Sequence, residues 1–160
     1  MGHLIADITE NISYSGYYFP ELFQKFFLLS PIDFRKYFAA NKFQFCSILS
    51  NFFYAEDTET IKIVFRNIDD EDRIKLVCGY TFFRLFNDLI MRDKWHLVEL
   101  SIREAMPSKG DKNRVKKAYM EFFEGIDPGE MTECVLAESS ERQRKRFFEL
   151  LDEIDSSVCQ

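Results

Sequence analysis

The stretch SILSNFFYAEDTETIKIVFRNI, residues 47–68, has the pattern of two amphipathic helices joined by a short polar turn. Apolar residues in each half recur at the spacing of one buried helical stripe: Ile48, Leu49, Phe52 and Phe53 before the turn, then Ile61, Val64, Phe65 and Ile68 after it. Helices joined by so short a turn lie antiparallel. The stretch therefore predicts a helical hairpin.

Shifting the sequence by 37 residues lays this stretch over RLFNDLIMRDKWHLVELSIREA, residues 84–105. Apolar positions coincide although few residues are identical, so either a helical repeat or two unrelated hairpins of equal length explains the match. A true repeat would stack hairpins side by side, as in an α-solenoid. The paired positions are Ile48 with Leu85, Leu49 with Phe86, Phe52 with Leu89, Phe53 with Ile90, Glu56 with Asp93, Ile61 with Val98, Ile63 with Leu100, Phe65 with Ile102 and Arg66 with Arg103.

Helical patterns continue over most of the chain, with short connections between them. Ser30 and Asp93 are expected N-caps, and Ser140 with Gln143 forms an expected capping box. We predict an all-α fold of nine to eleven helices, arranged as antiparallel helical hairpins in a bundle or a short α-solenoid. We expect one domain over residues 1–160, with N-terminal helices (1–43), stacked hairpins (44–125) and C-terminal helices with a short tail (126–160).

The composition excludes several classes of protein. The sequence is 46% hydrophobic and 16% aromatic, which is incompatible with a disordered chain. A net charge of −6 opposes nucleic-acid binding. No apolar run reaches the roughly 18 residues of a membrane span, and no secretory signal is recognisable. Four widely spaced cysteines and two histidines do not fit a zinc site, so we expect reduced cysteines and a cytoplasmic protein.

No catalytic, cofactor-binding or metal-ligating residue can be assigned. The chain lacks a Gly-rich phosphate loop, an H-E-x-x-H motif and a nucleophile elbow. His96 is expected to be structural. The acidic run at 69–72 is expected to be the solvated start of a helix, because it lacks the alternating ligands and the glycine of a calcium loop.

The segment FPELFQKFFLLSPIDFRKYF, residues 19–38, carries six of the eighteen phenylalanines. These rings cannot all face inward on two short helices, and exposed aromatic side chains are typical of contact sites. The segment therefore predicts a partner-binding surface, to which we add the single tryptophan. The predicted contacts are Phe19, Pro20, Leu22, Phe23, Phe26, Phe27, Pro31, Phe34 and Trp95.

Residues 19–43 resemble an F-box. Phe19, Pro20, Glu21 and Leu22 match its opening, Phe26, Phe27 and Leu29 its apolar run, and Ser30, Pro31, Asp33 and Phe34 its second helix start, with ANKF (40–43) near its end. The resemblance implies docking to the Skp-type adaptor of cullin-RING ubiquitin ligases, with the remaining helices recruiting substrates.

Two shorter stretches carry further resemblances. DKWHLVELSIREA (93–105) is similar to the second helix of an ankyrin repeat, which implies a degenerate ankyrin-like stack. ELLDEIDSS (149–157) resembles the acidic C-terminal translocation signals of type IV secreted effectors of intracellular bacteria, which implies delivery into a host cytosol.

We therefore expect a non-catalytic adaptor that binds proteins, an effector in a host–pathogen interaction if the last resemblance holds. A binding inhibitor or chaperone-like regulator of one specific partner is the alternative, and an enzyme without a recognisable motif is the third. No cofactor is expected.

Overall fold

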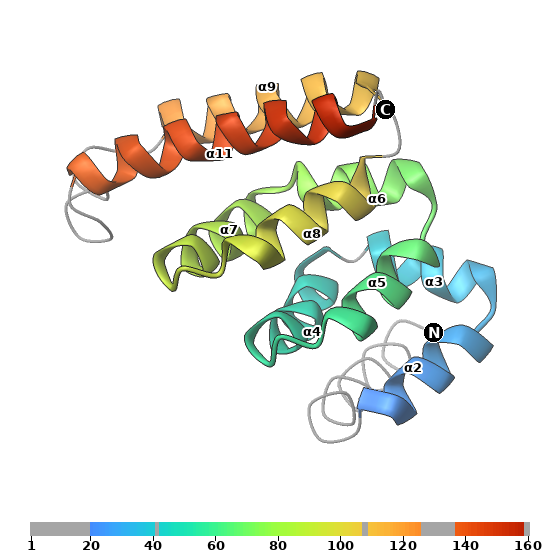
Figure 1. Ribbon diagram of the computed structural model, residues 1–160. Coiled ribbons are helices and arrows are strands. Elements are labelled where there is room, and N and C mark those ends of the chain that lie inside the picture. The colour runs from blue at the N-terminus through green and yellow to red at the C-terminus, as the bar shows by residue number, and fades with distance from the viewer. Residues whose placement is uncertain (1–19, 41, 107–108, 126–136, 159–160) are drawn as a thin grey trace. The chain divides into compact units, whose positions relative to one another are not determined.

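The computed structural model describes residues 20–40, 42–106, 109–125 and 137–158, which form nine α-helices and contain no strand (Figure 1). The prediction of an all-α fold is confirmed. The backbone divides into two compact units, residues 1–76 and 77–160. The division at residues 43 and 125 and the single domain stay predictions, and the helix expected near residues 126–136 lies outside the described residues.

The first unit contains five helices: α2 (Pro20–Leu29), α3 (Ile32–Ala40), α4 (Lys42–Tyr54), α5 (Thr58–Arg66) and most of α6 (Asp70–Val77). Within it α2 packs beside α5, α3 beside α4, and α4 beside α5 (Figure 1). The core consists of Phe23 and Phe27 of α2, the apolar stripe of α4 and that of α5. Cys46 of α4 is buried in this unit, as its apolar surroundings predict.

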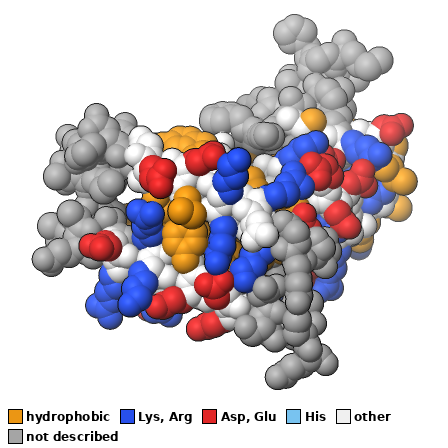
Figure 2. All heavy atoms as spheres, turned by 90° about the horizontal axis from the view of Figure 1, so that it is seen from above, with side chains coloured by type: hydrophobic (Ala, Val, Ile, Leu, Met, Phe, Trp, Pro, Cys, Tyr) orange, Lys and Arg blue, Asp and Glu red, His pale blue; other side chains and the backbone are white. Residues whose placement is uncertain are grey.

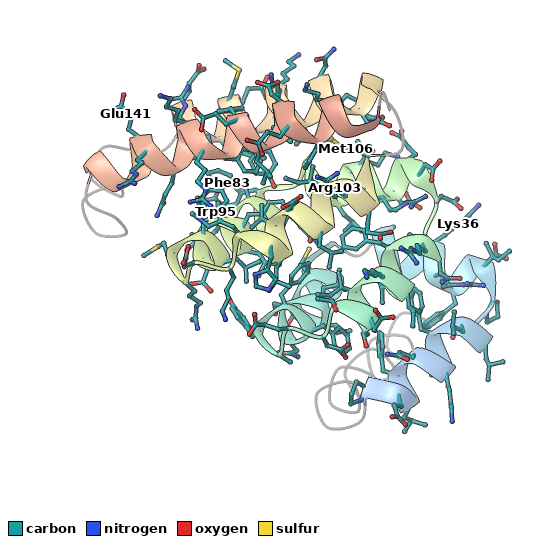
Figure 3. The ribbon with its side chains drawn as sticks, viewed as in Figure 1. Lys36, Phe83, Trp95, Arg103, Met106 and Glu141 are labelled. Carbon is teal, nitrogen blue, oxygen red and sulfur yellow. The ribbon has the colours of Figure 1, made fainter. Side chains whose placement is uncertain are left out.

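Polar contacts fix α3 to the connection between α5 and α6. The Nη1 of Arg35 donates to Oδ1 of Asn67 at 3.2 Å, and Lys36 (Figure 3) forms an ion pair with Asp69 at 3.2 Å. Asn67 in turn donates to the carbonyl oxygen of Ile63 at 2.8 Å. These contacts hold the α2–α3 corner against the rest of the first unit.

The second unit contains α7 (Tyr80–Met91), α8 (Trp95–Ala105), α9 (Lys109–Gly125) and α11 (Ala137–Val158). Its core is an aromatic cluster around Phe83, whose ring centroid lies 5.1 Å from those of Phe122 and Phe123. Tyr119 stacks on Phe147 at 4.7 Å and donates its hydroxyl to the carbonyl oxygen of Val77 at 2.9 Å. Aromatic pairs with ring centroids 4.5–7 Å apart stabilise the fold by more than the burial of their apolar area alone.

Charged side chains cover the outer surface of α11. After Glu141 its exposed charges are basic in the first half of the helix (Arg142, Lys145, Arg146) and acidic in the second half (Glu149, Asp152, Glu153). Figure 2 shows Lys, Arg, Asp and Glu side chains on the face seen from above. Lys116 and Lys112 of α9 bind Oδ1 of Asp152 at 2.7 Å and 3.1 Å. The inward residues Phe147, Leu151 and Ile154 are buried, so the helix packs through its apolar side and exposes its charged side to solvent.

Three predicted helix starts are wrong. Ser30 does not cap α3, because its hydroxyl donates back to the carbonyl oxygen of Phe26 at 2.8 Å, and the first helical bond of α3 goes to Pro31. Asp93 has a left-handed backbone with φ 58°, so Lys94 is the N-cap of α8. Ser140 lies inside α11, which begins at Ala137.

The two hairpins offset by 37 residues have the same local structure. α4 and α7 end at Tyr54 and Met91, and α5 and α8 begin at Thr58 and Trp95, so both boundaries shift by 37 residues. Six of the seven apolar pairs predicted from the sequence are buried in both hairpins, and the seventh, Ile63 with Leu100, is half-buried in both. The buried positions are Ile48, Leu49, Phe52, Phe53, Ile61 and Phe65 and, 37 residues on, Leu85, Phe86, Leu89, Ile90, Val98 and Ile102.

The turns of the two hairpins are also equivalent. Glu56 and Asp93 have φ values of 55° and 58°, and no other non-glycine residue described has a positive φ. The next residue donates its N–H to the carbonyl oxygen five positions back, from Asp57 to Phe52 at 2.9 Å and from Lys94 to Leu89 at 2.8 Å. Both turns are therefore Schellman motifs, which end a helix by placing one residue in the left-handed region.

Candidate protein-binding surface

α2 carries two apolar faces that meet different surroundings. Phe23 and Phe27 are 1% and 2% exposed and stack on each other at 5.9 Å, and Phe23 also contacts the ring of Phe52 of α4 at 4.9 Å. They belong to the core of the first unit. A partner docked on the folded protein does not reach these two rings, so we remove Phe23 and Phe27 from the predicted contacts.

The other apolar face of α2 is open to solvent. Leu22, Phe26 and Leu29 are 57%, 42% and 86% exposed. Their i, i+4, i+7 spacing places them on one side of the helix. Ile32, the first residue of α3, adds a side chain that is 62% exposed. We call these four residues the α2–α3 stripe.

Other predicted contacts flank the α2–α3 stripe. Phe34 of α3 is half-buried, and its ring meets that of Phe26 edge to face at 6.0 Å. Pro31 is exposed at the corner between the helices, and Pro20 is half-buried at the start of α2. Phe19 lies outside the described residues.

Trp95 belongs to the second unit, whereas the other predicted contacts belong to the first. It is half-buried at the start of α8 (Figure 3), and the guanidinium carbon of Arg146 of α11 lies 4.6 Å from its ring centroid. This geometry is a cation–π contact, which accounts for the tryptophan within its own unit. The structure gives no reason to group it with the α2–α3 stripe.

The sequence prediction omitted two members of the α2–α3 stripe, Leu29 and Ile32. The F-box resemblance includes Leu29 in its apolar run, which says nothing about exposure, and it assigns no role to Ile32. A helical-wheel projection of residues 20–29 gives the missing signal for Leu29, because it shares a side with Leu22 and Phe26, opposite the phenylalanine pair.

Comparison of the helices related by the 37-residue shift identifies the positions of α2 that the fold buries. Shifted by 37 residues, α2 falls on α5, and α5 on α8. The inward positions are buried in all three helices: Phe23, Thr60 and Leu97, then Phe27, Val64 and Ser101. The same fold position therefore faces inward in each helix.

The outer positions of these helices differ sharply in chemistry. The residues equivalent to Leu22 are Glu59 of α5 and His96 of α8. The residues equivalent to Leu29 are Arg66 of α5 and Arg103 of α8. All six side chains are exposed. Phe26 corresponds to Ile63 and Leu100, which are half-buried. The helix therefore folds with charged residues at the two outer positions, and the leucines of α2 are not needed for packing.

Large contiguous apolar patches are uncommon on monomeric soluble proteins and mark sites of contact with other molecules. Leucine side chains at the two most exposed positions leave apolar area in water at a cost of roughly 1.5–3 kcal/mol each relative to burial. The α2–α3 stripe is thus the surface of the described residues best suited to bind a protein.

The part of the chain that the structure describes contains neither a metal site nor a membrane-spanning helix. No group of three or more His, Cys, Asp or Glu residues there is arranged to hold a metal ion. None of the helices in that part is both long enough and apolar enough to cross a bilayer. Hydrogen bonds from Lys116 and Lys112 hold the pKa of the Asp152 carboxyl below its ordinary value of 3.8.

Comparison of the chain with protein-family models, with curated proteins and with solved structures found no match.

Proposed function

We propose that this chain is a non-catalytic protein-binding adaptor that docks a partner through the α2–α3 stripe. The observation that carries the proposal is the exposure of Leu22 and Leu29 at positions where the equivalent helices carry charged or polar side chains. Buried apolar anchors at the centre of an interface supply most of its binding energy. The stripe presents four exposed apolar side chains, at the corner between α2 and α3, for burial by a partner.

The partner class follows from the F-box resemblance of residues 19–43, which contain the whole α2–α3 stripe. We propose a Skp-type adaptor of a cullin-RING ubiquitin ligase as the protein that binds it, with helices elsewhere in the chain recruiting substrates. The ankyrin-like resemblance of residues 93–105 supports the second role, since ankyrin-like stacks bind proteins. Delivery into a host cytosol, supported by the resemblance at residues 149–157, is part of the same proposal.

The test uses the double variant Leu22→Glu/Leu29→Arg. The variant places on α2 the residue types that α5 carries at the equivalent positions, Glu59 and Arg66. We therefore expect the fold to remain intact. Binding to a purified Skp-type adaptor, measured by calorimetry or interferometry, should weaken at least about tenfold for each side chain lost from the interface. Circular dichroism and the denaturation midpoint establish that the variant is folded.

Met91→Glu is the matched control, because Met91 is 53% exposed at the end of α7 and lies off the stripe. It should bind as the native protein does. Equal binding by the double variant and the control would remove the α2–α3 stripe as the site. Failure of the native protein to bind the adaptor would remove the F-box assignment.

The second function is a binding inhibitor or chaperone-like regulator of one protein, which would use the same stripe. The composition of the complex captured from eukaryotic lysate separates the two functions. An adaptor co-purifies with ligase components, whereas an inhibitor co-purifies with one stoichiometric partner and no ligase component.

A further inference from the structure

The equivalence of the two hairpins extends to the helix that precedes each of them. α3 leads into α4 and α5, and α6 leads into α7 and α8, with helix lengths of 9, 13 and 9 residues in one set and 8, 12 and 11 in the other. The ends of α3 and α6, Ala40 and Val77, are again 37 residues apart. Each set is a short helix, a longer helix, a Schellman turn and a closing helix.

We infer that residues 32–66 and 70–105 are two copies of one three-helix module, and that α2 is a third occurrence of its closing helix. Two positions are buried in all three helices, Phe23, Thr60 and Leu97 and then Phe27, Val64 and Ser101, whereas Leu28 of α2 is exposed where Phe65 and Ile102 are buried. The turns that precede α5 and α8 have the same geometry. A left-handed residue other than glycine is uncommon. Its occurrence twice in the described residues, at a spacing equal to the module length, is unexpected for two unrelated hairpins.

The closing helices of the module share buried positions but differ in the residues at their outer positions. The inward positions of the closing helix are buried in every copy, whereas its outer positions carry Leu22 and Leu29, Glu59 and Arg66, or His96 and Arg103. Tandem modules with a shared core and differing outer residues present a different surface on each copy. The copies therefore differ in surface chemistry at residues 22 and 29, 59 and 66, and 96 and 103.

This inference does not rest on the proposed function. The α2–α3 stripe could fail to bind any ligase adaptor while the modular construction holds. Conversely, the hairpins could prove non-interchangeable while the stripe still binds a partner. The experiment below therefore measures folding and needs no binding partner.

The test duplicates residues 57–93 within the full chain, a segment of one 37-residue repeat length that runs from the N-cap of α5 to the turn after α7. Both junctions then fall directly after a left-handed residue, Glu56 or Asp93, and each copy begins with the N-cap Asp57. The control duplicates residues 57–91, which omits the left-handed turn residue and shifts the following helices by two positions.

We expect the duplication of 57–93 to give a monomer with native helicity per residue and one cooperative unfolding transition. The denaturant m-value should rise by about a quarter, because m scales with the surface exposed on unfolding and hence with chain length. The duplication of 57–91 should show lower helicity per residue and an m-value no higher than the native one. Equal behaviour of the two duplications would overturn the inference.

Deletion of residues 57–93 is the second variant. It joins Glu56 to Lys94, so α8 follows α4 through the same type of turn. We expect lower stability with native helicity per residue, since an array loses stability with each module removed. An unfolded deletion alongside a folded 57–93 duplication still supports the module, because the shorter array has one fewer stabilising neighbour.

Discussion

Gln24 of α2 donates its Nε2 to Oγ1 of Thr60 of α5 across 2.7 Å, and the same Thr60 hydroxyl donates to Oδ2 of Asp57 at 2.6 Å. Thr60 is fully buried, and Asp57 also accepts the backbone N–H of Thr60 as the N-cap of α5. One side chain thus links the start of α5 to the neighbouring helix that carries the α2–α3 stripe.

Replacing this hydroxyl should destabilise the first unit. Thr60→Val keeps the volume but removes the acceptor of the Gln24 amide and the hydroxyl donor to Asp57, which keeps only the backbone N–H of residue 60. The change should cost about 2–3 kcal/mol of the free energy of unfolding. Urea denaturation measures the loss. Thr81→Val, at an exposed threonine of α7, should change the free energy by less than about 0.5 kcal/mol. Equal effects at the two sites would show that the buried hydroxyl does not stabilise the first unit.

Glycine at the left-handed turn residues should stabilise the protein. A non-glycine residue in the left-handed region costs roughly 1–2 kcal/mol, partly offset by the greater entropy that glycine has in the unfolded chain. We expect Asp93→Gly to raise the free energy of unfolding by about 0.5–1 kcal/mol, and Glu56→Gly to shift it in the same direction. Asp93→Ala should lower it, because alanine adopts this backbone less readily than aspartate. A lower thermal midpoint for Asp93→Gly would contradict the left-handed assignment.

The Tyr119 hydroxyl should contribute to the stability of the second unit. Tyr119→Phe retains the aromatic stack on Phe147 but removes the donor to the Val77 carbonyl, at a cost of about 1–2 kcal/mol because the site is buried. Guanidinium denaturation gives the value. Tyr80→Phe is the control, since Tyr80 is 50% exposed, and a loss as large there would assign the effect to tyrosine hydroxyls in general.

The ion pairs of Asp152 should make the docking of α11 weakly sensitive to acid. Because the pKa of Asp152 is lower in the folded protein than its ordinary value of 3.8, the stabilisation is fully present above that value. It is lost as the pH falls through the lower folded pKa. We expect a small effect, since the carboxylate is largely exposed and solvent screens it.

The measurement compares the denaturation midpoints of the native protein and Asp152→Asn between pH 7 and pH 2. The difference should be constant near neutral pH and vanish at the acid end. A difference that persists at pH 2 would mean that the amide disturbs packing rather than removing a charge. Glu153→Gln, at an exposed neighbour on α11, should show no difference at any pH.

The sequence predicted the helices better than it predicted their ends. Periodicity located the buried faces of α4, α5, α7 and α8 because helix packing depends on the spacing of apolar residues. The starts at Ser30 and Asp93 were wrong, because a serine can donate back to its own helix and an aspartate can occupy a left-handed turn. The residue at which a helix begins depends on local backbone geometry, which the residue types alone do not reveal.

The candidate surface was located only in part. The sequence indicated an aromatic surplus in residues 19–38, and the exposure of Phe26 accounts for some of it. Phe23 and Phe27, two of the predicted contacts, are core residues. The side of α2 that is buried depends on how the helix packs against α4 and α5, which residue type alone does not indicate. The most exposed member, Leu29, is not aromatic. An argument from side-chain type alone therefore could not find it.

The hydrogen bond between Ser30 and the Phe26 carbonyl also bears on covalent regulation. Ser30 precedes Pro31, the dipeptide that proline-directed protein kinases recognise, but its side chain is only 8% exposed and its hydroxyl is engaged in the last turn of α2. A phosphate there would have to displace that bond and would add roughly two negative charges beside Leu29 and Ile32. Ser30 is thus protected from a kinase while α2 is folded, and its phosphorylation would report the unfolding of this corner.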